Sequence, residues 1–293
     1  TTLLGVGSLL LGTTQARAFT AGVRQAQPQD VDVTAFLVGL KDSDAAALRD
    51  DARAVVGKAL GPLHPALTSN AVSRMRRFDG TRRLGYLEST DSLTTRSKLT
   101  SGRWATARGE AVVPQTTADR LNLNLGDRIT LGEELGLKPV ETPVTVVIVG
   151  TFRPTSRSGW EGDPLSGSGY NATYSDGSSV PTPAFGPFVV DDATFLATGS
   201  TVDALQVTGH PSLAHATDAS MTATVNRFRS ADGLLTARVG NRVEISRLAS
   251  DLPVTLDRVH AQQAATRSMV LVVLLMGTTL ALTALLLAGR LLY

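Results

Sequence analysis

The sequence predicts an α+β domain between membrane-spanning helices, and three features support this fold class. Residues 268–289 form an uncharged, leucine-rich segment between Arg267 and Arg290. At about 1.5 Å of rise per residue, a helix over residues 269–288 would cross the roughly 30 Å hydrocarbon core of a bilayer. Residues 1–16 form a second uncharged apolar segment, and residues 17–267 mix strand-like and helix-like patterns.

Residues 1–16 have two interpretations. Gly5, Ser8 and Gly12 share one helical face, as small residues do where membrane helices pack, which favours the outer half of a first span. The alternative is a cleavable signal peptide, because Ala16 and Ala18 flank Arg17 in a small-x-small pattern. We expect residues both before this segment and after the second span.

Strands are expected where β-branched residues alternate with polar ones or follow a turn signal, at residues 31–38, 72–78, 81–87, 109–114, 126–131, 144–152, 189–190, 204–207 and 242–247. A helix is expected over residues 43–60, capped by Ser43, since Leu48, Ala52 and Val56 share one face. Shorter patterns predict a helical turn capped by Thr116 or Thr117 and ending at residue 121, and a helix over residues 214–229.

Residues 154–187 are rich in Gly, Ser and Pro, which is typical of a long functional or disordered loop. Trp160, Tyr170 and Tyr174 lie within it. These aromatic side chains either recognise a partner or fold the loop onto its own domain.

The segment before the second span predicts a rigid connection. Asp251 and Pro253 are typical of a helix start, and nothing breaks a helix from there to Arg267. One continuous helix would pass motion between the domain and the bilayer, or would merely hold the domain away from lipid. Within the span, a stripe of small residues is expected to pack against another transmembrane helix: Gly277, Ala281, Ala284 and Ala288.

The composition disfavours several kinds of chemistry. The chain has no cysteine, a net charge of +2 and four scattered histidines, so we predict no disulfide scaffold, no metal site and no nucleic-acid partner. No phosphate-binding loop or nucleophile elbow is found, so no catalytic residue or cofactor is predicted. Arginines cluster in residues 74–83, where Arg74 and Arg76 would share a face of a hairpin. They form a solvated basic edge or contact lipid phosphates or an anionic wall polymer.

The middle of the chain resembles a known family. The segment Gly102-Arg103-Trp104 is followed by a strand at 109–114, by Gly126-Asp127 after a short helix, and by a strand at 144–152 that contains Val149-Gly150. This order resembles the extracytoplasmic domain of FtsX/MacB-like ABC transporter permeases, of the type found in high-GC Gram-positive bacteria.

The resemblance implies a non-enzymatic permease subunit in the cell membrane, with its large domain outside the cytoplasm. A separate cytoplasmic ATP-binding subunit would drive it, the assembly would be dimeric or pseudo-dimeric, and the outer domain would handle a lipoprotein, a peptide or a wall hydrolase. It also implies a two-lobed outer domain with small mixed sheets. The expected division is a partial first span (1–16), the first lobe (17–98 and 199–252), an inserted second lobe (99–198), a coupling helix (253–267) and the second span (268–290). The alternative is the sensor region of a two-span receptor kinase or chemoreceptor.

Overall fold

The computed structural model describes residues 19, 21–23, 26–40, 44–78, 81–136, 140–155, 160, 162–175 and 181–291. The expected first span at residues 1–16 and the turn at residues 79–80 lie outside the described residues. The helices are α2 (Ala45–Leu60), α3 (Leu93–Arg96), α4 (Gln115–Leu121), α5 (Asp192–Ala197), α6 (Asp218–Val239) and α7 (Leu252–Leu291), with short 3-10 helices at Pro28–Asp30, Gly61–Leu63 and Gly240–Arg242.

The strands are β1 (Val33–Leu40), β2 (Ala66–Ser73), β3 (Arg76–Phe78), β4 (Leu84–Thr90), β5 (Ser97–Gly102), β6 (Glu110–Pro114), β7 (Arg128–Glu134), β8 (Val144–Pro154), β9 (Tyr170–Tyr174), β10 (Thr182–Val190), β11 (Val202–His210) and β12 (Ile245–Ala249). All of them belong to one hydrogen-bonded sheet with the order β12-β1-β11-β2-β4-β3-β7-β8-β6-β10-β9, and β5 pairs with β8. Sequence patterns had given no indication of β5 or β9 as strands.

Part of this sheet closes into a six-stranded barrel. Strands β4, β3, β7, β8, β6 and β10 pair in turn, and a parallel pairing of β10 with β4 completes the ring. Small barrels are filled by side chains, and here Phe78 packs edge-on against Phe185 and Phe188 with ring centroids 5.9 Å apart. Gly85 leaves room for this cluster, because a Cβ there would lie 2.9 Å from Leu131.

The expected arrangement of two lobes with separate small sheets, flanked by transmembrane helices, is therefore wrong. One sheet runs through the whole domain, and the barrel takes β3 and β4 from the chain before residue 99. Among the described residues, one helix is long and apolar enough to cross a membrane. The lobes merge because residues far apart in sequence, such as those of β4 and β10, pair side by side.

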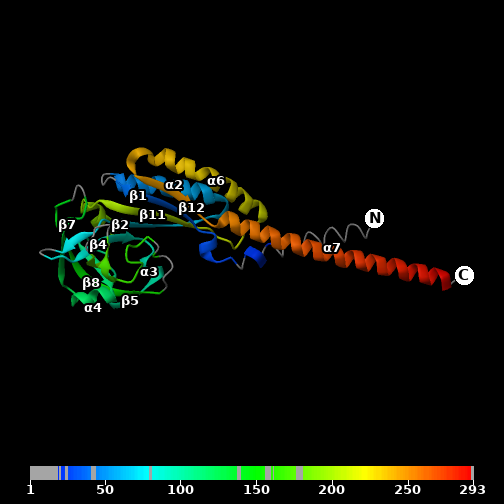
Figure 1. The fold of residues 1–293 in the computed structure, drawn as a ribbon, viewed down its shortest axis with the longest axis horizontal. Helices are drawn as coiled ribbons and strands as arrows, with labels where there is room; N and C mark the ends of the chain where they lie inside the picture. Colours follow the sequence, from blue (N-terminus) through cyan, green and yellow to red (C-terminus); the bar gives the residue numbers. More distant parts are fainter. Residues whose placement is uncertain are drawn as a thin grey trace.

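Outside the barrel, helices α2 and α6 cover one face of the strands β12, β1, β11 and β2 (Figure 1). Alternate residues of β1 are buried, as expected for a strand with one covered face. The predicted face of α2 is confirmed, since Leu48, Ala52 and Val56 are buried. Helix α6 begins at Asp218, later than predicted, because Thr217 and Ser220 form its capping box.

The predicted loop over residues 154–187 is partly wrong. Strand β9 lies within it, and β10 begins at Thr182. The Thr caps predicted for the helix near residue 117 are also wrong. Helix α4 follows Pro114 with no side-chain cap, and the Thr117 hydroxyl donates to the Gly169 carbonyl instead.

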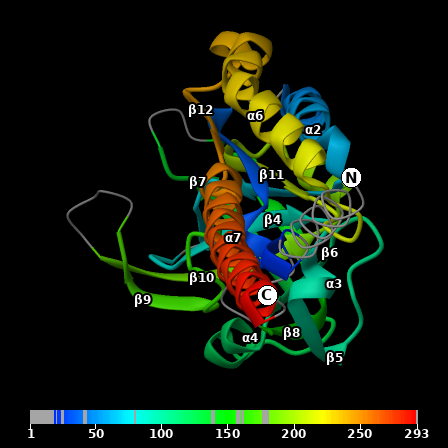
Figure 2. The ribbon, with the colours of Figure 1, turned by 90° about the vertical axis from the view of Figure 1, so that its right-hand side faces the viewer.

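Helix α7 confirms the predicted continuous connection. It is a single helix of 40 residues that leaves the domain and extends far beyond it (Figure 1), and Figure 2 looks nearly along it from its C-terminal end. Its first turns are docked, with Leu252, Leu256 and Val259 all buried. The candidate membrane span within it covers Leu252–Ala284, and its apolar part is exposed.

Candidate functional site

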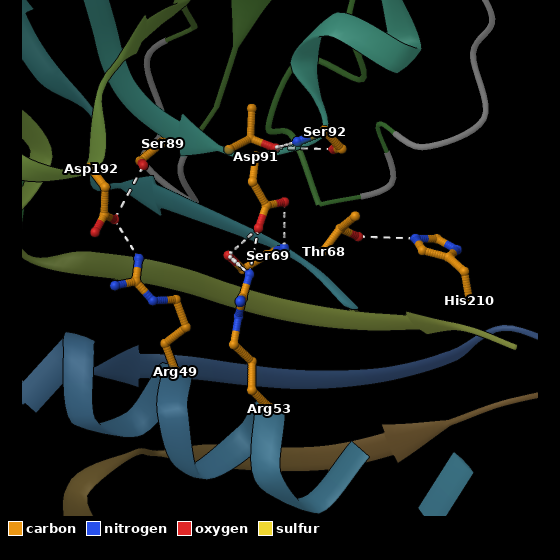
Figure 3. A network of polar contacts seen from close by, with 10 residues as sticks. Arg49, Arg53, Thr68, Ser69, Ser89, Asp91, Ser92, Asp192 and His210 are labelled. Carbon is orange, nitrogen blue, oxygen red and sulfur yellow. Dashed lines mark hydrogen bonds and ion pairs between the residues drawn. The ribbon is translucent and has the colours of Figure 1, made fainter. Parts of the chain in front are cut away.

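The barrel and the helical layer are joined by a polar network, shown in Figure 3. Arg49 and Arg53 lie four residues apart on α2, so they share a face. Arg49 pairs with Asp192 at the start of α5, and Arg53 donates to Asp91 just after β4. Asp91 also accepts from the Ser69 backbone N–H at 2.8 Å. The network therefore ties α2 to the ends of the barrel strands β4 and β10, through Asp91 and Asp192.

A pocket of about 140 Å³ lies next to this network. Its wall is mainly apolar, with Leu93, Val112 and Val189 beside the half-buried ring of Trp104. The acidic residues Asp91 and Asp191 also belong to the lining. The remaining lining residues are Thr90, Thr94, Ala105 and Val190. The pocket could hold one small apolar group beside a negative charge.

Behind the pocket wall is a stack of aromatic rings. Trp104 lies 6.3 Å from Phe152, which stacks on Trp160 at 5.9 Å, measured between ring centroids. The Arg96 guanidinium lies over the Trp160 ring at 3.9 Å from the ring centroid and pairs with buried Glu88. Trp160 is 1% exposed, so its predicted role on a partner surface is wrong, and the alternative of folding onto its own domain is confirmed. Burial of the large ring outweighs its place in a Gly-rich segment.

The buried acids beside this stack have shifted pKa values. Burial raises the pKa of Glu88 to about 7, with Asp163 adding to the shift and Arg96 opposing it. Burial also raises the pKa of Asp163, although that carboxylate accepts hydrogen bonds from the Tyr86 hydroxyl and the Gly167 N–H. The Trp160 indole N–H and Glu88 Oε2 have no hydrogen-bond partner within the described residues. The cluster is enclosed, and it stabilises the segment that carries Trp160 inside the fold.

Arg76 does not lie on a surface, and its predicted role in partner contact is wrong. It is 0% exposed and donates to the Gly132 and Thr142 carbonyls, Glu134 and the Ser200 hydroxyl at 2.8–3.0 Å. These acceptors come from distant parts of the chain, so no local pattern could have indicated the burial. Arg74 is partly exposed and lies 3.8 Å from Asp203.

The family motif residues have structural roles in the barrel. Gly102 has a φ of +72°, and a Cβ there would lie 2.2 Å from the Val149 carbonyl, so only glycine fits where β5 meets β8. Arg103 forms a bidentate ion pair with Glu110, and this pair lowers the pKa of Glu110 to about 2. Gly126 also has a positive φ, and Asp127 accepts from the Asn124 N–H at 2.7 Å, which fixes the turn before β7.

A histidine network was not predicted. His210 on β11 contacts Asp32 through Nδ1 at 2.9 Å and the Thr68 hydroxyl through Nε2 at 3.0 Å. The hydrogen bond to Asp32 raises the pKa of His210. This order of an acid, a base and a hydroxyl resembles a hydrolase triad, but hydrolysis also needs hydrogen-bond donors placed for an oxyanion, so the three residues alone do not define an active site. Cross-strand register brings the three together from the residue before β1, from β11 and from β2.

Two further predicted residues can be placed. Tyr170 is half-buried on β9, with its ring 5.0 Å from that of Phe185 and the Arg120 guanidinium 4.9 Å from its ring centroid. In α7, Gly277, Ala281 and Ala284 lie on the exposed apolar part, and the side chain of Ala288 lies outside the described ones. Within the described residues, no group of three or more His, Asp or Glu side chains could hold a metal ion.

Comparison with protein-family models and with curated proteins finds no significant match. The resemblance to the permease family therefore rests on the sequence motifs. Among the described residues, the structure shows a domain that contains a β-barrel, attached to one helix that is long and apolar enough to cross a membrane.

Proposed function

We propose that the chain is part of a permease subunit of the FtsX/MacB type, which transmits ATP-driven motion from a cytoplasmic partner to an extracytoplasmic domain. The observation that carries this proposal is the continuity of α7. A single helix of 40 residues starts in the core of the domain and includes the apolar segment. At about 1.5 Å per residue it is roughly 60 Å long, enough to link the domain to the far side of a bilayer.

The docking of α7 supports a mechanical role. Leu252 is 0% exposed, and the Thr255 hydroxyl donates to the Asp30 carbonyl at 3.0 Å. Further along, His260 contacts Asp218 at the start of α6 at 2.6 Å. Apolar, backbone and polar contacts thus hold the first turns in one orientation, so a tilt of the helix would move the domain with it.

In this proposal the domain lies outside the cytoplasm of a cell membrane and handles a lipoprotein, a peptide or a wall hydrolase. The subunit works in a dimeric or pseudo-dimeric assembly with a cytoplasmic ATP-binding subunit. The stripe of Gly277, Ala281, Ala284 and Ala288 packs against another transmembrane helix, because small residues let helix backbones approach in lipid.

The test is whether nucleotide moves the outer domain. The full chain is co-purified with the cytoplasmic ATP-binding subunit that the proposal requires, and the complex is placed in nanodiscs. A spin label at Leu234→Cys reports the distance between two copies, and the absence of native cysteines makes the label specific. We expect ATP with vanadate to shift this distance.

A distance that ignores nucleotide in a complex with active ATPase would contradict the proposal. The absence of an ATP-binding partner, together with a distance that responds to an external ligand, would favour the receptor sensor instead. Ala281→Leu should weaken the nucleotide response, with Leu282→Ala as a neighbouring control outside the stripe.

A further inference from the structure

The pocket beside the junction network has the size of a binding site for one small apolar group. Its volume is about 140 Å³. For comparison, an engineered apolar cavity of about 150 Å³ binds benzene. The pocket is lined by Leu93, Val112 and Val189, which belong to a buried apolar cluster with Phe152 and Trp160. Unlike that cavity, the pocket is partly open to solvent, and these residues give it an apolar floor on which a phenyl ring or a leucine-sized side chain could lie.

The wall favours an aromatic ligand that carries a positive charge. The half-buried Trp104 side chain lines the pocket, and its ring packs against Phe152 with the ring centroids 6.3 Å apart. An indole attracts both aromatic rings and cations. Ala105, the next residue, is small and leaves the space beside the ring open.

The charges at the pocket leave one carboxylate without a cation. Asp91 is balanced by Arg53, and Asp192 nearby is balanced by Arg49. Asp191 lines the pocket and accepts from the Thr194 N–H and hydroxyl, and among the described residues it forms no ion pair. Each carboxylate oxygen can accept a further hydrogen bond. Asp191 caps the start of α5 with both oxygens, so its negative charge is held in place at a pocket that is partly open to solvent.

We propose that this pocket binds an apolar group, aromatic by preference, that carries a protonated primary amine. The apolar group lies on Val112 and Val189 against Trp104, and the ammonium donates to Asp191. The shared chemistry fits a small aromatic amine or the N-terminal residue of a peptide. The proposal goes beyond the transmission of motion and does not depend on it.

The test uses three probes of similar size on the full chain in nanodiscs. Phenethylamine is cationic, 2-phenylethanol is neutral and phenylacetate is anionic. The protein carries 5-fluorotryptophan, and its two tryptophans give two ¹⁹F signals, which Trp104→Phe assigns. Phenethylamine should shift the Trp104 signal saturably. Its affinity should exceed that of 2-phenylethanol about fivefold, in line with a partly exposed ion pair, and that of phenylacetate by more than tenfold.

Two variants with controls test the residues. Ala105→Leu should fill the cavity and weaken phenethylamine binding at least tenfold, whereas Ala107→Leu, exposed in the same loop and outside the lining, should not. Asp191→Asn keeps the cap of α5, because Asn caps helices as well as Asp, and should remove the preference for the amine over the alcohol. The Trp160 signal checks that each variant is folded, and Asp191→Asn keeps the test valid if Ala105→Leu misfolds.

Phe-Gly-amide separates the two ligand sources. Binding as tight as that of phenethylamine identifies a peptide N-terminus, and binding at least tenfold weaker identifies a small amine. An unchanged Trp104 signal with all three probes would overturn the proposal. So would equal binding of phenethylamine and phenylacetate, or equal binding by the Ala105→Leu and Ala107→Leu variants.

Discussion

Replacing Arg76 by methionine tests the buried polar centre of the barrel. The guanidinium is 0% exposed, and its partner Glu134 is about as deeply buried, with 1% of its side chain accessible. Arg76 donates four hydrogen bonds, to the carbonyls of Gly132 and Thr142 and to the side chains of Glu134 and Ser200. Methionine keeps much of the volume but supplies no donor, so the Glu134 carboxylate stays buried without its cation.

The expected loss of stability follows from the buried Glu134 charge that the substitution leaves without a cation. Removing one partner of a buried ion pair costs about 3–5 kcal/mol, because the remaining charge is uncompensated. The Thr201 N–H still donates to Glu134 at 2.8 Å, which keeps the expected loss toward the lower end of this range. The double variant Arg76→Met/Glu134→Leu removes both charges and should recover part of the lost stability.

The assay is urea unfolding of the full chain in detergent, followed by tryptophan fluorescence, since Trp104 and Trp160 both belong to the barrel region. The neighbouring pair Arg77–Glu133 provides the control, because its side chains are 45% and 54% exposed. Arg77→Met should cost about 0–1 kcal/mol. Equal losses of stability for Arg76→Met and Arg77→Met would show that burial does not make the Arg76–Glu134 pair more important than an exposed pair.

Three further predictions concern the span and two titrating groups. Leu280→Arg should block membrane insertion, since a mid-bilayer arginine costs about 2.5–3.5 kcal/mol on insertion scales. Leu234→Arg on α6 is the control and should not affect insertion. If the Leu280→Arg variant stayed in the membrane fully under carbonate extraction, a span there would be contradicted. Burial raises the pKa of Glu88 from 4.5 to about 7, so between these pH values the folded state keeps a proton that the unfolded chain has released. The free energy of unfolding should therefore fall as the pH rises from 4.5 to about 7. Glu88→Gln should flatten that slope in urea midpoints measured against pH, and an unchanged slope would count against it. The pKa of His210 is raised by Asp32, so its stabilising contribution is present below the unfolded pKa of about 6.5 and lost as pH rises through the folded value. Asp32→Asn should abolish this loss, and the same pH profile in both proteins would contradict the assignment.

Local patterns predicted the elements whose contacts are local or one-sided. The face of α2, the strand β8 and the start of α7 all follow from spacing and capping signals, because each element buries one regular set of side chains. The apolar character of α7 needed only length and composition.

The closed barrel and the pocket could not be predicted in the same way. Closure depends on β10 lying parallel to β4, a pairing between residues roughly a hundred positions apart that leaves no local signal. Burial of Arg76 and Trp160 likewise depends on partners supplied by other segments. Asp91 and Asp191 line one pocket because β4 and β10 run parallel and end side by side.

The proposed transmission of motion requires α7 to be rigid, and the distance between α6 and the apolar segment of α7 in one chain measures that rigidity. Spin labels at Leu234→Cys on α6 and Met276→Cys in the apolar segment, both exposed, report the connection in nanodiscs. We expect one narrow distance distribution that Ala261→Ser leaves unchanged. Ala261→Pro should clearly broaden or shift it, because proline removes a backbone hydrogen bond and kinks the helix. A broad distribution in the unmodified helix, indistinguishable from that of Ala261→Pro, would contradict the claim that α7 connects the domain rigidly to the membrane.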